Sequence, residues 1–397
     1  MFVKQKSDPF VSPFMKSFIS GSGEEVTYET ALQDPTVNAC IRIISNTIST
    51  LPLKLYKQQQ GSLGKEWQED LASQMAYILT CRPNPRQTST EFIEQMVAQL
   101  CLYSEFYAMV DYTNAGKVLR ITPFNSPKQV SVIEHGDGLR YDCITNEGKG
   151  VVLNEDQIFV VRDLTLNTFK ALDKILLAKS TIGLSLSATH NAESYYKVGS
   201  RSGGFIKVDG VLSDESYARL ARQVNDAYAG KDNAHKIGIL EGNSSYVENT
   251  YSLKDAQVLE SRNASIREIA TLFGVPIPLL GIPDNNFKDV ESINSFFYKS
   301  RLQSLITKIE ARFRLILPSG YALKFDTSDY LRGDAKTNAE VAELLFTRGV
   351  IGRNETRKRL GMQADTSEDL YVVASNNLVF GTISDFTKTI GEVTNEE

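Results

Sequence analysis

Few side chains in this sequence of 397 residues are of the types and spacing that catalysis requires. The three histidines, His135, His190 and His235, stand in unrelated contexts: a turn signal, the polar part of a helix and a position after a polar loop. Neither a GxSxG nucleophile motif nor an HExxH zinc motif occurs. Acidic pairs and clusters at residues 24–25 and 66–70 lie in predicted loops, where solvated charge is the ordinary explanation. We therefore predict no catalytic residues and expect that the protein is not an enzyme.

The cysteines and glycines give no sign of a metal or a cofactor either. Cys40, Cys81, Cys101 and Cys143 are far apart, without a CxxC pair or a Cys/His cluster, so we expect reduced, mostly buried side chains and no metal site. The glycine-rich run at residues 199–204 follows a helix and lacks the Gly-Lys-Ser/Thr ending of a phosphate loop. A helix end followed by a turn explains this run, and we predict no cofactor.

Composition and charge narrow the class of protein. The chain is 42% hydrophobic and 23% charged, which is ordinary for a globular protein of this length. It contains no apolar run long enough to span a membrane, and its N-terminus lacks the apolar core of a signal peptide. The net charge is -5, and basic residues are dispersed apart from one denser run at residues 348–359. Tight, sequence-reading DNA binding is therefore disfavoured, whereas an acidic surface past which DNA slides is compatible with these values.

The first ~165 residues predict an α+β domain in which helices pack on antiparallel sheet. Asp34 and Pro35 signal a helix start, and Thr88 with Glu91 forms a capping-box pattern before a second helix. From about residue 105 to 163 the apolar period changes to two, with hairpin turns at residues 114–116 and 135–138. Residues 1–30 are expected to be mobile, or to be ordered only by a partner. The stretch LKLYK, residues 53–57, predicts a strand, and residues 57–70 predict a polar loop.

The second half of the sequence predicts two long helices that enclose a small α+β insert. Helical spacing runs over residues 172–198 and returns over 253–273. Between them we expect a strand at 205–212, a helix from Ser213 to about Tyr228 and a strand at 235–242. A strand at 321–325, two short helices, the second with Asn354 as its cap, and an acidic tail complete the chain.

Residues 291–317 predict one unbroken helix, which at 1.5 Å per residue would be about 40 Å long. Its apolar face consists of Ile293, Phe297, Leu302, Leu305, Ile309, Phe313 and Ile316.

The segment LFGVPIPLLGIPDNNF, residues 272–287, joins the preceding helix to this long one. Pro276 and Pro278 favour extended backbone before each proline, so the preceding helix must end at about Phe273. Gly274 can adopt the left-handed conformation that caps a helix. Residues 284–289 have few apolar side chains to anchor them, which favours a mobile polar loop on a stiff base. The residues alone leave two explanations open: a loop that touches something and yields, or a plain connection between helices.

Five stretches, in the same order, carry a resemblance to one family. They are TALQDPTVNACIRIISNTISTLPLKLYK, RPNPRQTSTEFIEQMVAQLCLYSEFYAMV, IREIATLFGVPIPLLG, NNFKDVESINSFFYKSRLQSLITKIEARFRLIL and LRGDAKTNAEVAELLFTRGVIGRNETRKRLGM. Each resembles a stretch of the portal proteins of tailed bacteriophages, in the compact form found in many long-tailed phages. The Phe-Gly-Val-Pro segment at residues 273–276, followed by Leu-Leu-Gly, is the most specific part of the resemblance.

The resemblance implies an α+β portal fold that assembles as a ring. It implies a flexible N-terminal arm at residues 1–30, an α+β wing at 31–165, a stem helix at 166–202, a small α+β clip insert at 203–247 and a second stem helix at 248–275. The elbow and tunnel loop would be residues 276–290, the long wing helix and its strand residues 291–333, and the crown-side helices and acidic tail residues 334–397.

The resemblance also implies a function and a set of partners. About twelve copies would form a ring at one capsid vertex, through which double-stranded DNA passes without sequence specificity during packaging and ejection. A large terminase, which hydrolyses ATP, and later a head–tail adaptor would dock on the clip, and the ring would contact the major capsid or scaffold protein. The expected location is the virion, after assembly in the host cytoplasm, with no cofactor and no membrane.

The residues that the resemblance implies for contact with DNA belong to two segments. The tunnel loop would present Asp284, Asn285, Asn286, Phe287 and Lys288, whose polar groups can touch the phosphate backbone without reading sequence. Candidate channel-lining cations on the second stem helix are Lys254, Arg262 and Arg267, for which ion pairing between subunits is the alternative. Gly274, Pro276 and Pro278 would form the elbow.

Two other functions stay open at this point. Another head–tail connector or a minor capsid protein is the closer alternative, although adaptors are usually much shorter and lack the embedded clip insert. A nucleic-acid-processing enzyme is the more distant one, because it would need a metal-binding carboxylate set or a phosphate loop.

Overall fold

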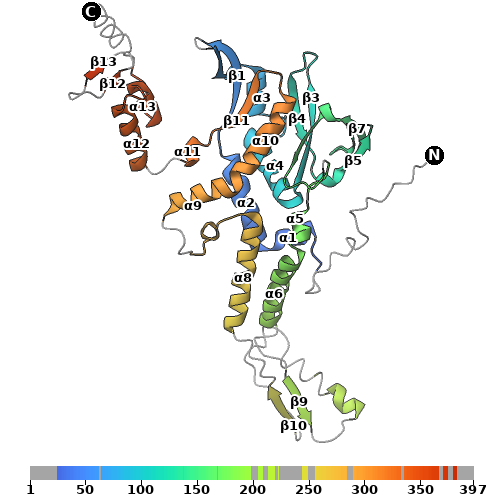
Figure 1. Cartoon of the computed structure of the whole chain (residues 1–397). Coiled ribbons are helices and arrows are strands. Elements are labelled where there is room, and N and C mark those ends of the chain that lie inside the picture. The colour runs from blue at the N-terminus through green and yellow to red at the C-terminus, as the bar shows by residue number, and fades with distance from the viewer. Residues whose placement is uncertain are drawn as a thin grey trace, which may run out of the picture. The chain divides into compact units, whose positions relative to one another are not determined.

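The computed structural model describes residues 25–61, 64–136, 138–167, 169–197, 204–208, 213–219, 222, 244–248, 255–283, 289–331, 335–365, 370–373 and 379–381. The chain divides into two compact units, one within residues 1–285 and 296–325 and the other within residues 286–295 and 326–397. Figure 1 labels the helices and strands of both units.

The first unit begins with two closely linked helices, α1 (Tyr28–Gln33) and α2 (Pro35–Ser49). The Asp34 carboxylate caps α2 as predicted, because it accepts two backbone N–H bonds from the first turn. The expected mobility of residues 1–30 does not hold for residues 27–30: Thr27 caps α1, and the Tyr28 ring packs on Tyr103 with centroids 4.6 Å apart. Residues 1–24 lie outside the described part of the chain.

Residues 53–69 form a β-hairpin where we expected a strand followed by a polar loop. Its strands are β1 (Leu53–Gly61) and β2 (Gly64–Glu69), and most of their polar side chains are exposed, so no burial pattern marks them in the sequence. Backbone pairing holds β1 instead, with β2 on one side and β11 (Tyr321–Phe325) on the other, both antiparallel. The partner β11 comes from far along the chain, which local sequence patterns do not reveal.

Two further antiparallel sheets have three strands each. The strands β3 (Glu105–Tyr112), β4 (Val118–Pro123) and β8 (Ile158–Arg162) form one in the order β4-β3-β8. The strands β5 (Val130–His135), β6 (Gly138–Ile144) and β7 (Gly150–Asn154) form the other in sequence order. The hairpins predicted around residues 114–116 and 135–138 are both confirmed.

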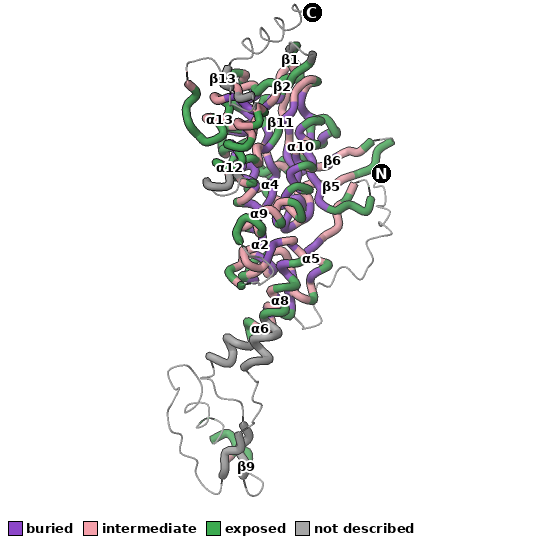
Figure 2. Tube along the Cα trace, turned by 60° about the vertical axis from the view of Figure 1, so that its left-hand side comes forward, coloured by how far each residue is buried: buried purple, intermediate pink, exposed green. Residues whose placement is uncertain are grey.

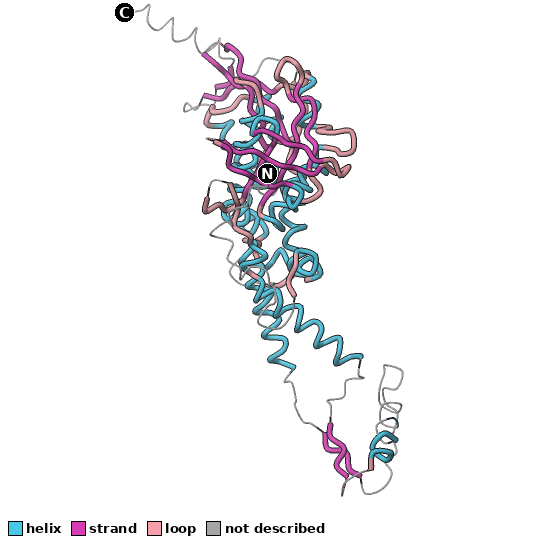
Figure 3. Tube along the Cα trace, turned by 90° about the vertical axis from the view of Figure 1, so that its right-hand side faces the viewer, coloured by secondary structure: helices cyan, strands magenta, loops and turns pink. Residues whose placement is uncertain are grey.

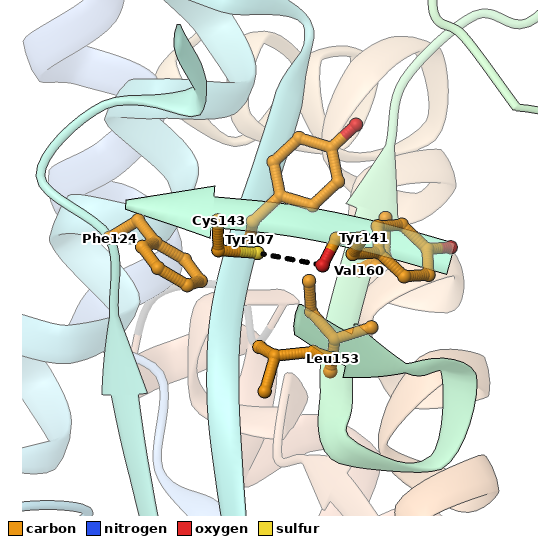
Figure 4. Packing of buried hydrophobic residues seen from close by; sticks show 7 residues of the cluster. Tyr107, Phe124, Tyr141, Cys143, Leu153 and Val160 are labelled. Carbon is orange, nitrogen blue, oxygen red and sulfur yellow. Dashed lines mark hydrogen bonds between the residues drawn. The ribbon is translucent and has the colours of Figure 1, made fainter. Parts of the chain in front are cut away.

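One face of the β4-β3-β8 sheet packs on the β5-β6-β7 sheet. The shared core consists of Tyr107, Phe124, Tyr141, Cys143, Leu153, Ile158 and Val160, all of them buried. Figure 4 shows six of these labelled side chains meeting between the strands, with the Cys143 thiol donating to the Tyr141 carbonyl at 3.6 Å. All four cysteines are free, and all but Cys81 are buried, as expected.

The opposite face of the same sheet is covered by α4 (Ser89–Tyr103) and α10 (Gln303–Ile316). Figure 2 shows buried segments in the labelled helices α4 and α10. A row of aromatic rings crosses this interface from Phe92 through Phe106 and Phe159 to Phe313, with centroid separations of 5.8, 6.2 and 4.7 Å. Alternate residues of β8 therefore point into two cores, and the strand is buried along its whole length. The residue that follows β8, Asp163, is consequently held in a fixed place.

The two predicted long helices and part of the insert between them are present. They are α6 (Lys179–Lys197), preceded by the short α5 (Lys174–Leu177), and α8 (Asp255–Phe273), which contacts α6 (Figures 1 and 3). In the insert, β9 (Gly204–Val208) pairs antiparallel with β10 (Ser244–Glu248). The strand β9 was predicted and β10 was not, and the strand predicted at 235–242 lies outside the described residues. The Ser213 hydroxyl accepts from the Ser216 N–H at 3.4 Å, as expected for the start of the insert's helix.

The prediction of one unbroken helix over residues 291–317 is wrong. A π-helical turn, Tyr298–Leu302, separates α9 (Val290–Phe297) from α10, and its Gln303 N–H bonds to the Tyr298 carbonyl five residues back. An α-helix turns about 100° per residue, so side chains five apart would diverge by about 140°. A π turn brings residues at this spacing towards one face. Phe297 and Leu302, five apart, are both completely buried, which the π turn makes possible.

The second unit contains α11 (Ser328–Leu331), α12 (Ala335–Thr347), α13 (Arg353–Arg359) and a ribbon of β12 (Tyr371–Val373) and β13 (Val379–Gly381). The two predicted helices, α12 and α13, are confirmed. Asn354 does not cap α13, because Gly352 holds the cap position and the Asn354 side-chain oxygen instead accepts from the Asp365 N–H at 2.8 Å. Arg353 pairs with the same aspartate at 3.2 Å, so the segment after α13 is tied back to the helix.

The contribution of the α4 cap to stability can be tested. Thr88 and Glu91 form the predicted capping box, with the Thr88 hydroxyl accepting from the Glu91 N–H at 3.3 Å. Thr88→Ala should lower the free energy of unfolding by about 1 kcal/mol. Thr90→Ala, an exposed threonine in the same helical turn, is the control and should change it by less than about 0.5 kcal/mol. Chemical denaturation followed by circular dichroism measures both free energies of unfolding. Equal losses would show that the Thr88 cap stabilises the protein no more than the exposed Thr90 does.

Candidate functional site

Most of the residues predicted to contact DNA are not described by the structure. Asp284, Asn285, Asn286, Phe287, Lys288 and Lys254 lie outside the described residues. Arg262 lies in α8, but nothing is described of its side chain, whereas Arg267, further along the same helix, is exposed. The elbow residues Gly274, Pro276 and Pro278 are described, and the geometry of the site can be built from them.

The elbow ends α8 with a Schellman motif, a left-handed residue closed by two backbone hydrogen bonds. Gly274 has φ +71°; its N–H bonds to the Thr271 carbonyl at 3.1 Å, and the Val275 N–H bonds to the Ala270 carbonyl at 2.9 Å. The buried Pro276 leads into a 3₁₀ turn, Ile277–Leu280, which itself ends in a left-handed glycine at position 281. The predicted helix end at Phe273 and the left-handed conformation of Gly274 are confirmed.

Gly274 rests directly on the side chain of Arg301. A Cβ atom placed on Gly274 would lie 3.2 to 3.4 Å from the Cβ, Cγ and Cδ atoms of Arg301, closer than most real contacts. Arg301 belongs to the π turn, so the elbow after α8 contacts the helix to which the chain returns after residues 284–288. Gly274 is therefore required for two reasons, its backbone conformation and the space taken by Arg301.

The other end of Arg301 reaches a buried carboxylate. Its Nη2 atom lies 2.9 Å from the Oδ2 atom of Asp163, which follows β8. Lys174, the first residue of α5, contacts the same carboxylate, and the Lys308 Nζ atom lies 3.3 Å from Oδ1 and also donates to the Asp163 carbonyl. We call these four residues the Asp163 cluster. The Asp163 side chain is only 6% exposed, so its charge must be stabilised by these partners.

The charges of the cluster determine its protonation state. Burial alone would raise the pKa of the Asp163 carboxyl, but the positive charges of Lys174 and Arg301 outweigh burial and hold the pKa well below its ordinary value. Burial raises the pKa of the neighbouring Cys101 thiol, so Cys101 stays neutral beside the Arg301 guanidinium. Asp163 is consequently ionised throughout the neutral pH range.

The same carboxylate holds the start of α5, the short helix before α6. Lys174 is held at its side chain by Asp163 and at its backbone N–H by the Ser104 hydroxyl, at 3.4 Å. Ser104 ends α4 with φ 62°, uncommon for a residue other than glycine, and its carbonyl accepts from the Asp163 N–H at 2.9 Å. The Tyr28 hydroxyl donates to Asp173, the N-cap of α5, so α1 also anchors this point.

Arg267 is exposed to solvent, unlike the buried Asp163. It lines a surface groove between the first long helix and α8, together with Leu177, Ala178, Thr181, Glu268, Ile269, Thr271 and Leu272. The structure does not bring Arg267 to the Asp163 cluster or to another described candidate cation. Its side chain is therefore available for contacts outside its own subunit.

Sequence reasoning missed the whole Asp163 cluster. Its members are scattered from residue 163 to residue 308, and no motif links them. The only local signal is a buried strand of four apolar residues, 158–161, that ends in Arg162 and is followed by Asp163. Within the described residues, no group of three or more His, Cys, Asp or Glu side chains could hold a metal ion. Of the helices in that part of the chain, none combines the length and the apolarity needed to cross a membrane.

Comparisons with known proteins identify relatives of this chain. The family described as "Phage portal protein" matches residues 35–361. The chain is 27% identical over 364 residues to the "Probable portal protein" of Streptomyces phage phiC31, covering 85% of this chain and 77% of that protein. It is 26% identical over 340 residues to the "Portal protein" of Enterobacteria phage HK97, covering 83% and 79%.

Solved structures share the fold. A crystal structure of an HK97 family phage portal protein from Corynebacterium diphtheriae matches with a TM-score of 0.58 and 16% identity, covering 77% of this chain and 96% of that one. A chain from the neck of a native GTA (gene transfer agent) particle, computed with C12 symmetry, matches with a TM-score of 0.57 and 22% identity, covering 85% and 92%.

Substitutions at two glycines of the elbow distinguish the energetic cost of backbone strain from the cost of a close side-chain contact. Gly274 and Gly281 both have positive φ, but a Cβ at Gly281 would meet nothing within 4 Å. Gly281→Ala should therefore lower the free energy of unfolding by about 1 to 2 kcal/mol through strain alone. Gly274→Ala should lower it further, because Arg301 must also move. Denaturation curves give the free energy of unfolding of both variants. Equal losses would mean that the close contact between Gly274 and Arg301 adds nothing to the cost of the substitution.

The charge of Asp163 predicts a pH-dependent loss of stability. Asp163→Asn should lower the free energy of unfolding by about 3 to 5 kcal/mol at pH 7, because it leaves buried cations without their partner. The native pKa of Asp163 lies below the unfolded value, which is about 3.9. The difference from the wild type should therefore be complete above about pH 5 and shrink as the pH falls below about 4.

The control for this measurement is Asp142→Asn. Asp142 pairs with Arg140 at 2.9 Å on the surface of β6, with both side chains about 40% exposed. A surface pair of this kind contributes about 0 to 1 kcal/mol. Urea denaturation at several pH values compares the variants, and a loss at Asp163 that is small or independent of pH would contradict the assignment.

Proposed function

The chain belongs to the phage portal protein family, and we propose that about twelve copies of it close into a ring around a channel for double-stranded DNA. A portal protein is a structural component of the virion, located at a capsid vertex. The observation that carries the proposal is the family match over residues 35–361, which includes both long helices, the elbow and the helices after it. The related GTA neck, computed with C12 symmetry, supports the subunit number.

The electrostatics support a channel through which DNA slides. The chain has a net charge of -5, and a protein that neutralises many phosphates would bind DNA tightly and release it slowly. Residues 284–288 contain two asparagines and one lysine, which can make weak contacts with phosphates and carry no sequence information. We propose that this segment is the tunnel loop and that the elbow is its base.

The exposed Arg267 has two possible partners in a ring. It can face DNA in the channel, or it can pair with a carboxylate of the neighbouring subunit, and both roles require the solvent exposure that it has. The same two roles apply to Lys254 and Arg262. An increase in DNA release after Arg267→Gln in intact rings would favour the first role, and loss of the rings would favour the second.

The remaining assignments follow from the portal role. We propose that the insert at residues 203–247 forms the clip, on which the large terminase and later the head–tail adaptor dock, and that the ring contacts the major capsid or scaffold protein. Hydrolysis of ATP is assigned to the terminase, and this chain is assigned no catalytic activity. Assembly in the host cytoplasm is part of the same proposal. The residue ranges proposed for wing, stem and crown remain those given by the resemblance.

Deleting residues 285–288 tests the role of the loop. We expect rings of unchanged mass, roughly 500 kDa for twelve chains of 44.2 kDa each, because the deletion lies outside the described packing of the elbow. We also expect less DNA packaged or retained per procapsid. Light scattering on a sizing column measures the mass, and nuclease protection measures the DNA. Normal packaging would remove the assigned role of the loop, and a protein that stays monomeric even in procapsids would contradict the ring.

A further inference from the structure

We infer that Arg301 is a positioning residue, which fixes the direction of the elbow after α8 by anchoring it to Asp163 at the end of β8. Its aliphatic part supports Gly274, and its guanidinium pairs with the carboxylate 2.9 Å away. One side chain thus links the point where the chain leaves α8 to the end of β8.

Within the described residues, the elbow makes no backbone hydrogen bond to the sheet. Its own hydrogen bonds are local: Gly274 and Val275 bond back to α8, and Gly281 bonds back to Pro278. These bonds fix the shape of the elbow but not its orientation. Residues 277–280 are only partly buried, and within the described residues the elements that contact this turn include α2. The direct link between the elbow and the end of β8 is therefore Arg301.

The position of Arg301 is itself restrained by the packing around it. It lies in the π turn between Phe297 and Leu302, both completely buried, so the backbone on either side of it cannot rotate without opening the core. Its side chain is 15% exposed, and its partner Asp163 follows a strand that is buried on both faces. A π turn within a helix is rare and is often found at functional positions. Here it turns Arg301 towards the carboxylate while keeping the apolar neighbours in the core.

The same carboxylate also holds the short helix that leads into α6. Asp163 binds Lys174 at the start of α5, and Lys308 on α10 completes the set. The Asp163 cluster thus links the segment before α6 to the segment that supports the elbow. The consequence for DNA rests on the proposed function: displacement of Arg301 would change where the loop stands in the channel without dissolving the ring.

Hydrogen exchange on assembled rings tests the positioning role without reference to DNA. Arg301→Met keeps the aliphatic support but removes the charge, and Arg301→Lys keeps a charge. We expect Arg301→Met to accelerate exchange about tenfold at Gly274, Val275, Leu279 and Gly281, with exchange in β3 and β8 unchanged. Arg301→Lys should restore part of the protection. Arg314→Met, an exposed arginine on α10, is the matched control and should change nothing.

Three results would overturn the inference. These are unchanged protection at the elbow in a folded Arg301→Met ring, an equal acceleration throughout β3 and β8, and failure of both Arg301 variants to fold. The last two would show that Arg301 supports the whole fold and not the elbow in particular. Nuclease protection in procapsids then tests the link to DNA separately. A loosened elbow with normal packaging would contradict the proposed role of the loop and leave the positioning role of Arg301 intact.

Discussion

The buried carboxylate of Asp163 is the interaction on which the junction of this protein depends. It receives cations from α5, from the π turn and from α10, while its own position is set by a strand packed on both faces. A carboxylate in such a place is unfavourable by itself, and removal of Asp163 would leave three cations without their shared partner. The three segments that meet there are thus coupled, and none can move far without separating charges in a poorly solvated place.

This coupling explains why the elbow combines a left-handed glycine, two prolines and a short 3₁₀ turn. Each of these features restricts the backbone locally, and the Schellman bonds at Gly274 satisfy the last carbonyl groups of α8. The local restrictions define a rigid shape, and Arg301 defines its orientation. The base that we propose for the tunnel loop is therefore restrained at the point where the chain leaves α8.

Local signals in the sequence predicted much of the fold, whereas contacts between distant segments could not be predicted from it. The caps at Asp34 and Thr88, both hairpin turns and the end of α8 at Phe273 depend on neighbours within a few residues, and all are confirmed. The pairing of β1 with β11 and the Asp163 cluster join distant segments, so no pattern in a single sequence marks them. The π turn was visible in principle: the apolar face of the long helix steps by five residues from Phe297 to Leu302, whereas its other steps are three or four. That step is incompatible with a regular α-helix that buries both residues, and it predicts the interruption that the structure has.

The pairing of cations within the Asp163 cluster is also relevant to how strongly a portal protein binds DNA. Exposed lysines and arginines bind phosphates by releasing counterions, and each such contact slows the movement of DNA. Lys174 and Arg301 are close to the base of the proposed tunnel loop in the fold, yet they are buried and paired with Asp163. Their positive charge therefore stabilises the protein and is not offered to DNA. A junction whose two most buried cations are paired with a carboxylate can be rigid without offering those cations to a polyanion.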